Sequence, residues 1–163
     1  MGQDIQIVVV FDETATERRK EAIRKLANQV HQFITNGILI HTYKAMIEKP
    51  QLGEAVGNCH NIALGFMTDL INAGHSHGWF WIQGGNKHRL NDRGEPWEHS
   101  WLEFDGFAVD GTARQKDKPD MPTITIGESE FYCKARNIKK IIKRLDAAQT
   151  RRWIFKQAKT EYA

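Results

Sequence analysis

The chain has 163 residues with a formal net charge of +3, and 40% of them are hydrophobic and 26% charged. This size and composition are typical of one domain with a single core, and no apolar run approaches the roughly 20 residues that a membrane span requires. The first residues lack the basic and apolar regions of a secretory signal, so we expect residues 1–163 to form one cytoplasmic domain without a membrane span, whose charge alone does not indicate nucleic acid.

The cysteine and histidine content argues against a disulfide framework and a metal site. Only two cysteines occur, Cys59 and Cys133, far apart and without paired spacing. Among the histidines only His75 and His77 approach the spacing of a zinc site. We therefore expect Cys59 to be a free thiol and predict no metal and no cofactor. A metal-dependent enzyme remains a third hypothesis, which bound zinc in the purified protein would support.

The N-terminal part predicts a strand and a helix. Residues 5–11 are rich in β-branched side chains, which suits a strand buried on both faces. Thr14 and Glu17 have capping-box spacing, and apolar residues then recur at helical spacing as far as Gly37. Residues 38–46 mix apolar and polar side chains and fit either a strand or an irregular segment.

The middle of the chain changes from a helical period to a strand. Residues 59–73 carry apolar side chains at helical spacing, and Gly74 offers a C-cap. Residues 79–82 then predict a strand. The polar, glycine-containing stretch 84–96 predicts a surface loop or lid that would carry substrate specificity.

A hairpin follows. Residues 97–104 and 107–109 form two β-like runs, joined by Asp105 and Gly106, a dipeptide strongly associated with tight hairpin turns.

The last third predicts a loop, a short strand and a basic helix. Residues 113–123 are loop-like, and 124–126 could add an edge strand. From Ala135 onward, apolar residues at helical spacing and outward-facing lysines and arginines predict a basic amphipathic helix. Such a face is usually only solvated, so nucleic acid or another acidic partner is an alternative and not the expectation.

Three residues have the chemistry of a thiol catalytic triad. Cys59 stands at the predicted start of a helix, where unpaired amides and the helix dipole stabilise a thiolate. Such a nucleophile needs a histidine base that a third residue orients. His99 and Asp110 lie on the two arms of the predicted hairpin, so its turn folds them alongside one another.

Each of the three also has a structural explanation. A lone cysteine at a helix start more often behaves as a small buried hydrophobe, and His99 could be a surface histidine on a strand. Asp110 could form an Asx-type turn with Gly111 and Thr112, or could do this and orient His99 as well.

The segments around these residues resemble a known family. GNCH at 57–60, opening a helix, and HSWLEFDGFAVDGT at 99–112 resemble the core of transglutaminase-like domains over about residues 55–115. The same Cys, His, Asp order is shared with papain-like proteases, arylamine acetyltransferases and related peptidoglycan peptidases. Thr112 matches the final Thr of the family pattern, whereas Gly111 replaces the usual Pro.

The resemblance implies a fold and a reaction. It implies an α+β fold in which helices pack on a small antiparallel sheet, with the catalytic cysteine at a helix N-terminus. It maps the nucleophile to Cys59, the general base to His99 and the orienting acid to Asp110. The implied activity is acyl transfer or hydrolysis of a protein or peptide-like amide through a thioester, as in a protease, peptidase, deamidase or transglutaminase.

The tetrahedral intermediate of this reaction needs donors aimed at its oxyanion. The backbone N–H of Cys59 is the first candidate. Trp79 and Trp101 are candidates to wall the substrate cleft, as aromatic residues often do. The second oxyanion donor could be the side chain of any of four residues, Asn58, His41, Tyr43 and Trp79.

A function from another class stays open. A non-catalytic domain could keep this fold and hold a partner in its cleft or on the basic C-terminal helix. Reaction with a small thiol reagent separates the two hypotheses, because only an activated Cys59 reacts faster than Cys133.

Overall fold

The computed structural model describes residues 5–48, 55–90, 94–112 and 121–162. In this part the chain forms five helices and six strands, which is an α+β fold as predicted. The elements in chain order are β1 (Gln6–Val10), α1 (Glu17–Thr35), α2 (Ile40–Glu48), α3 (Ala55–Ala73), β2 (Trp79–Leu90), β3 (Pro96–Phe104), β4 (Phe107–Asp110), β5 (Thr123–Glu128), α4 (Ser129–Ala135), β6 (Lys140–Leu145) and α5 (Ala147–Tyr162).

The six strands form one mixed sheet in the order β1-β5-β4-β3-β2-β6. β1 pairs with β5 in parallel and every other neighbouring pair is antiparallel, so the predicted small antiparallel sheet is confirmed except at β1, which makes the sheet mixed. The predicted hairpin is confirmed as β3 and β4. Asp105 and Gly106 have φ angles of 52° and 78°, and two successive positive φ angles are typical of the tight turn that matches strand twist.

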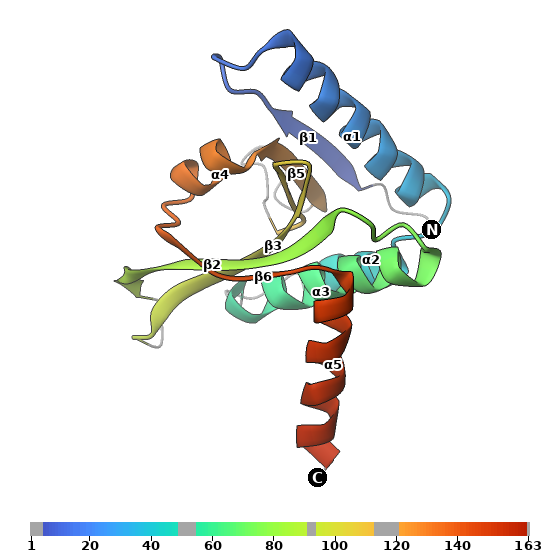
Figure 1. Cartoon of the computed structure of the whole chain (residues 1–163), viewed down its shortest axis with the longest axis vertical. Helices are drawn as coiled ribbons and strands as arrows, with labels where there is room; N and C mark the ends of the chain where they lie inside the picture. The colour runs from blue at the N-terminus through green and yellow to red at the C-terminus, as the bar shows by residue number, and fades with distance from the viewer. Residues whose placement is uncertain (1–4, 49–54, 91–93, 113–120, 163) are drawn as a thin grey trace.

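Helices cover the two faces of the sheet unequally. One face, which we call the helical face, packs against α1, α2 and α3 and holds the main hydrophobic core. The opposite face, the α4 face, carries a smaller cluster that includes Trp101 and Tyr132. In Figure 1, α4 and α3 lie on opposite sides of β2 and β6, and α5 extends away from the other elements. No helix among the described residues has both the length and the apolarity to cross a membrane.

Helix α1 begins later than predicted. Its N-cap is Thr16, whose hydroxyl accepts a hydrogen bond from the Arg19 amide at 3.2 Å. Thr14 instead hydrogen-bonds Asp12 in the preceding turn. The predicted end is confirmed, because Gly37 follows the helix with a φ of 68°.

Residues 40–48 form helix α2, which neither of the two predicted alternatives anticipated. The buried carboxylate of Asp69, on α3, accepts hydrogen bonds from the backbone N–H groups of His41 and Thr42 at 3.1 and 2.9 Å. A side chain from α3 therefore satisfies free amides at the start of α2. Gly65 allows the close approach, since a Cβ there would lie 3.1 Å from the His41 backbone.

The surface loop predicted at 84–96 is wrong for 84–90, while residues 91–93 lie outside the described residues. Strand β2 continues through Leu90, and β3 resumes the hairpin at Pro96. Glycine and polar residues do not break this strand because it pairs with β3 and β6 as far as Gly85 and with β3 alone beyond it. Gly85 is required there, since a Cβ would lie 2.3 Å from the Trp97 carbonyl oxygen.

The edges of the sheet also differ from prediction. Strand β5 lies between β1 and β4, so it is an interior strand, and β1 is the half-buried edge strand. The predicted basic helix is instead the edge strand β6 followed by α5. Spacing misled the prediction because Ile138, Ile141, Ile142 and Leu145 fit a helical stripe, although Ile141 and Ile142 are exposed. Of the predicted loop 113–123, residues 113–120 lie outside the described residues.

Candidate active site

Cys59 lies inside helix α3 and not at its start. The helix begins at Ala55, so Cys59 is its fifth residue. Only the first four amides of a helix lack intrahelical partners, and the field of the helix dipole falls off within the first turn. The prediction that the helix starts at Cys59 is therefore wrong, whereas its backbone N–H as an oxyanion donor stays a prediction.

Helix α3 brings Cys59 to strand β3. The side chains of Cys59 and His99 are hydrogen-bonded, and a hydrogen bond joins the next residue of each element, His60 and Ser100. Cys59 forms no disulfide with Cys133, the other cysteine of the described residues, and is buried with an exposed fraction of 3%. Two consecutive contacts thus fix this part of α3 against the middle of β3.

The pairing of β3 explains how the cysteine reaches the histidine. The β3–β4 ladder contains only three residue pairs, and its last pair is Leu102 with Val109. His99 lies beyond that pair, while its ring is on the α4 face among Trp97, Trp101 and Tyr132. Because no β4 residue pairs with His99, a side chain from α3 can contact the ring past the end of the ladder.

His99 and Asp110 are in direct contact, as predicted. His99 Nε2 donates to Asp110 Oδ2 at 2.9 Å. The same carboxylate forms an Asx-type turn, since Oδ1 accepts from the backbone N–H of Thr112 at 2.8 Å and from its hydroxyl at 2.5 Å. Asp110 therefore has both of the roles that the sequence left open.

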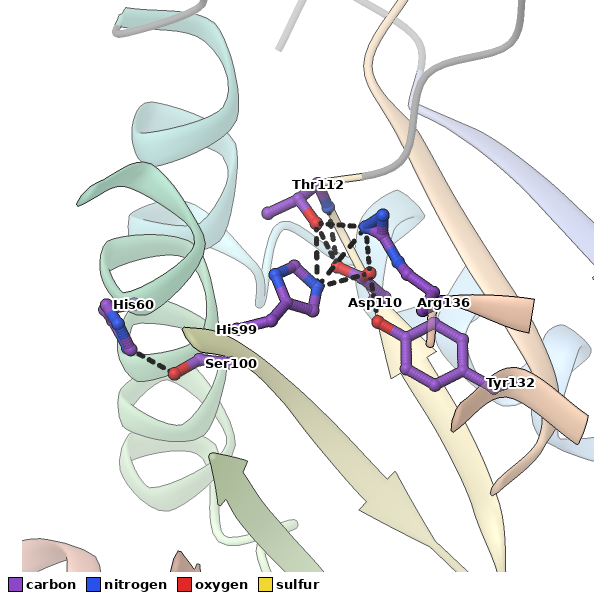
Figure 2. Close-up of polar contacts among 7 residues, drawn as sticks. All are labelled: His60, His99, Ser100, Asp110, Thr112, Tyr132 and Arg136. Atoms are coloured by element: carbon purple, nitrogen blue, oxygen red, sulfur yellow. Dashed lines mark hydrogen bonds and ion pairs between the residues drawn. The ribbon is translucent and has the colours of Figure 1, made fainter. Parts of the chain in front are cut away.

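The site also contains two residues that the sequence did not indicate. The Tyr132 hydroxyl donates to Asp110 Oδ2 at 2.5 Å, and Arg136 Nη2 donates to the same oxygen at 3.1 Å. Figure 2 shows His99 between α3 and the group that Asp110, Thr112, Tyr132 and Arg136 form. Tyr132 and Arg136 are four residues apart, a spacing that places side chains on one side of a helix. That spacing was the only available signal, and the short helix α4 had not been predicted.

The electrostatics of the pair favour a charged histidine and a charged aspartate. Burial opposes ionisation of Asp110, but His99, Arg136 and Thr112 outweigh it and hold the pKa of the carboxyl well below its usual range. Burial by itself would lower the pKa of His99. The charge and hydrogen bond of Asp110, with the hydrogen bond to Cys59, overcome this and the repulsion from Arg136, and raise the pKa of His99 to about 9.

His60 contrasts with His99. Burial, as the main cause, lowers the pKa of His60, so this ring is neutral at pH 7. Although it adjoins Cys59 in the chain, its contact is with Ser100 on the helical face of β3.

Aromatic rings hold His99 in place. The ring stacks on Trp97 at 5.6 Å with an interplanar angle of 11°, and on Trp101 at 5.8 Å with an angle of 20°. Trp101 is 1% exposed and supports the imidazole, and its predicted place in the wall of a substrate cleft stays a prediction. Gly84 makes room for it, because a Cβ there would lie 2.8 Å from Trp101 Cη2.

Trp79, the other predicted cleft residue, is not at the site. It pairs with Phe104, five residues along β2 from the pair of Gly84 and His99, which is about 17 Å in a strand. Its ring packs in the main core against Phe66.

Of the remaining predicted oxyanion donors, two lie away from the triad and one adjoins Cys59. His41 Nδ1 is bonded to Asp69 at 2.7 Å, and Tyr43 packs against the main core, so neither is at the triad. Asn58 precedes Cys59 on α3 and is half-buried, and its role as an oxyanion donor stays a prediction.

Helix packing explains the departure of Gly111 from the family pattern. A Cβ at Gly111 would lie 2.8 Å from Ile62 Cγ2 of α3 and 3.4 Å from the Met46 sulfur of α2. A larger residue would force Ile62, on the helix that carries Cys59, to shift.

The described residues contain no group of three or more His, Cys, Asp or Glu side chains that could hold a metal ion. Comparison with known proteins gives no match to any protein-family model, curated protein or solved structure.

Proposed function

We propose that this protein is a cysteine-dependent enzyme that transfers the acyl group of a peptide-like amide through a thioester on Cys59. The observation that carries the proposal is the continuous series of hydrogen bonds from Cys59 through His99 to Asp110. A thiol nucleophile requires a base in contact with it and a third residue that orients the base.

Nearby positive charge supports the role of Cys59 as the nucleophile. Asp110 contributes one negative charge, while His99 and Arg136 contribute two positive charges. Arg136 also interacts electrostatically with Cys59. The thiolate is the nucleophilic form of cysteine, and positive charge stabilises the negative charge on a sulfur that attacks.

The first step forms the thioester. The sulfur attacks the carbonyl carbon and the C–N bond breaks, while the departing nitrogen takes a proton from His99. Since Nε2 of His99 is held by Asp110 at 2.9 Å, we assign this proton to Nδ1. Asp110 keeps the ring oriented and stabilises its positive charge.

The second step releases the acyl group. Water or a second amine gives a proton to neutral His99 as it attacks the thioester carbon, the S–C bond breaks, and the thiolate and imidazolium return. A protease, peptidase, deamidase and transglutaminase share these two steps and differ in the amide they bind and in the final acceptor.

The direct test compares the wild type with Cys59→Ala on peptide, glutamine-amide and ester substrates. Cys59→Ala should lose all activity, while Cys133→Ala, which removes a half-buried thiol of α4, should keep it. Thermal unfolding of both variants verifies that they are folded. Activity that persists in folded Cys59→Ala would overturn the proposal.

Thiol labelling tests the activated nucleophile without a known substrate. Cys133 is an internal control, because burial and then Glu103 raise its pKa. Iodoacetamide should alkylate Cys59 faster than Cys133 at neutral pH, as mapped by peptide mass spectrometry. Equal rates would favour the alternative function, a non-catalytic binding domain.

A further inference from the structure

A cavity of about 430 Å³ adjoins the proposed triad on the α4 face. Cavities of this size hold small ligands or parts of larger ones. Two of its walls belong to the site, since Tyr132 and Arg136 both donate to Asp110. A third wall, Trp97, stacks on His99 at 5.6 Å.

Two guanidinium groups give this cavity a positive charge. Arg136 lies over the Tyr132 ring at 5.7 Å, and Arg89 lies over the Trp97 ring at 5.2 Å. Both arginines and both rings line the cavity, and none of the described lining residues is acidic. Stacking on a ring holds each guanidinium in position, which lowers the entropy lost when a ligand binds.

Arg136 can bind a ligand and Asp110 together. Its hydrogen bonds to Asp110 and Thr112 both use the single nitrogen Nη2, whereas a guanidinium has five N–H donors. Its side chain is 31% exposed, and its Nη2 lies 3.3 Å from Nε2 of His99, which places it beside the proposed triad.

We propose that this cavity binds a carboxylate of the substrate, so that the enzyme prefers peptides with a free carboxylate close to the scissile amide. Arg89 and Arg136 would bind the carboxylate, and the rings of Trp97, Phe131 and Tyr132 would pack against the apolar part of the same residue. This inference rests on the proposed acyl transfer. The carboxylate could be the C-terminus of a peptide or an acidic side chain, since the two have the same chemistry.

Binding to the Cys59→Ala protein tests the inference without turnover. The probes are acetyl-Ala-Phe as free acid and as amide, and acetyl-Ala-Glu-amide with its Gln counterpart, measured by calorimetry. We expect at least one acid to bind about tenfold tighter than its neutral partner, because ionised hydrogen bonds are the stronger ones. The pair that shows the preference identifies the source of the carboxylate. Equal affinities in both pairs would overturn the inference.

Arg89→Gln in the same background tests the site itself. Arg89 makes no contact with the triad, whereas a change at Arg136 would also disturb Asp110. The acid preference should fall to roughly a third, since an exposed charge contributes modestly. Arg152→Gln, an exposed residue of α5, makes the same charge change elsewhere and should leave the preference intact. Equal effects of the two substitutions would show that net charge, and not the cavity, selects acids.

Wild-type turnover separates this inference from the proposed function. If the wild type cleaves amides but shows no acid preference in binding, the carboxylate site fails and the acyl transfer stands. If acids bind preferentially but no amide or ester is turned over, the carboxylate site stands and the acyl transfer fails.

Discussion

Val109 and Asp110 are neighbours on β4, each 1% exposed, and they point to opposite faces of the sheet. Val109 joins the main core under the helices. Asp110 holds a negative charge with five hydrogen bonds from His99, Thr112, Tyr132 and Arg136. Burial of the first side chain stabilises the fold directly, whereas burial of a charge is expensive unless every lone pair is satisfied. The two side chains are equally buried, but Val109 contributes to packing on the helical face and Asp110 to the proposed chemistry on the α4 face.

The largest expected effect is on activity, and it tests whether Asp110 on the α4 face takes part in catalysis. Asp110→Asn should lower kcat about 10⁴-fold, because an amide no longer holds the proper tautomer of a catalytic histidine. Steady-state kinetics on the best substrate measure this change.

Asp69→Asn is the matched control for that substitution. Asp69 is also a buried carboxylate bonded to a histidine, but it lies between α2 and α3 and serves as a helix cap. Its substitution should lower stability and leave kcat within a few-fold. If both variants lose kcat equally, Asp110 acts through stability alone.

The next effect tests the helical face. Phe66 is 1% exposed in the main core, and Phe66→Ala should lower the free energy of unfolding by about 3–5 kcal/mol through lost packing and a cavity. Urea unfolding measures it. Phe155→Ala removes a ring that is 65% exposed on α5 and should change stability by less than about 0.5 kcal/mol. Similar losses in the two variants would contradict the assigned core.

The pH dependence of stability sharpens the comparison, because only the α4 face holds the His99–Asp110 pair. The pKa of His99 rises from 6.5 to about 9 on folding. The charged form is thus favoured in the folded state, so its stabilisation is complete below pH 6.5 and is lost as the pH rises through 9. The difference is of the order of 3 kcal/mol. Asp110, with a lowered pKa, has the opposite sign: its stabilisation is present above its ordinary pKa of 3.8 and is lost in more acidic solution.

Urea unfolding at pH 6 and pH 10 measures the histidine effect. His99→Gln is the control, since it keeps a polar side chain but removes the titration. The wild type should lose more stability than the variant between these two pH values. Equal losses would mean that His99 is not charged in the folded protein.

The sequence was most informative where a short-range rule determines the structure. The turn at Asp105 and Gly106 and the ends of α1 and α3 at Gly37 and Gly74 depend on positive φ angles, which glycine adopts readily and aspartate tolerates. The contact of His99 with Asp110 followed from that same turn. These features were predictable because they require neighbours in the chain only.

Long-range pairing explains what was missed. Residues 84–90 read as a loop, yet pairing with β3, and with β6 at Gly84 and Gly85, holds them as a strand. Tyr132 and Arg136 reach Asp110 from more than 20 residues away, as the separations of 22 and 26 residues show. No periodicity in the chain reports such contacts, because they depend on how β5 places α4 over the sheet.

The smallest expected effect measures how much one hydrogen-bond donor to Asp110 contributes to the free energy of unfolding. Tyr132→Phe removes the hydroxyl that donates at 2.5 Å and should lower the free energy of unfolding by about 1–2 kcal/mol, since a hydrogen bond to a charged group is lost. The carboxylate keeps its other donors, so kcat should fall only several-fold. Tyr43→Phe, on the helical side of the sheet, removes a hydroxyl for which the described residues provide no hydrogen-bond partner, and should change stability by less than about 0.5 kcal/mol. A loss from Tyr132→Phe no larger than that from Tyr43→Phe would mean that His99, Thr112 and Arg136 alone satisfy Asp110, and that Tyr132 packs against the site without stabilising its charge.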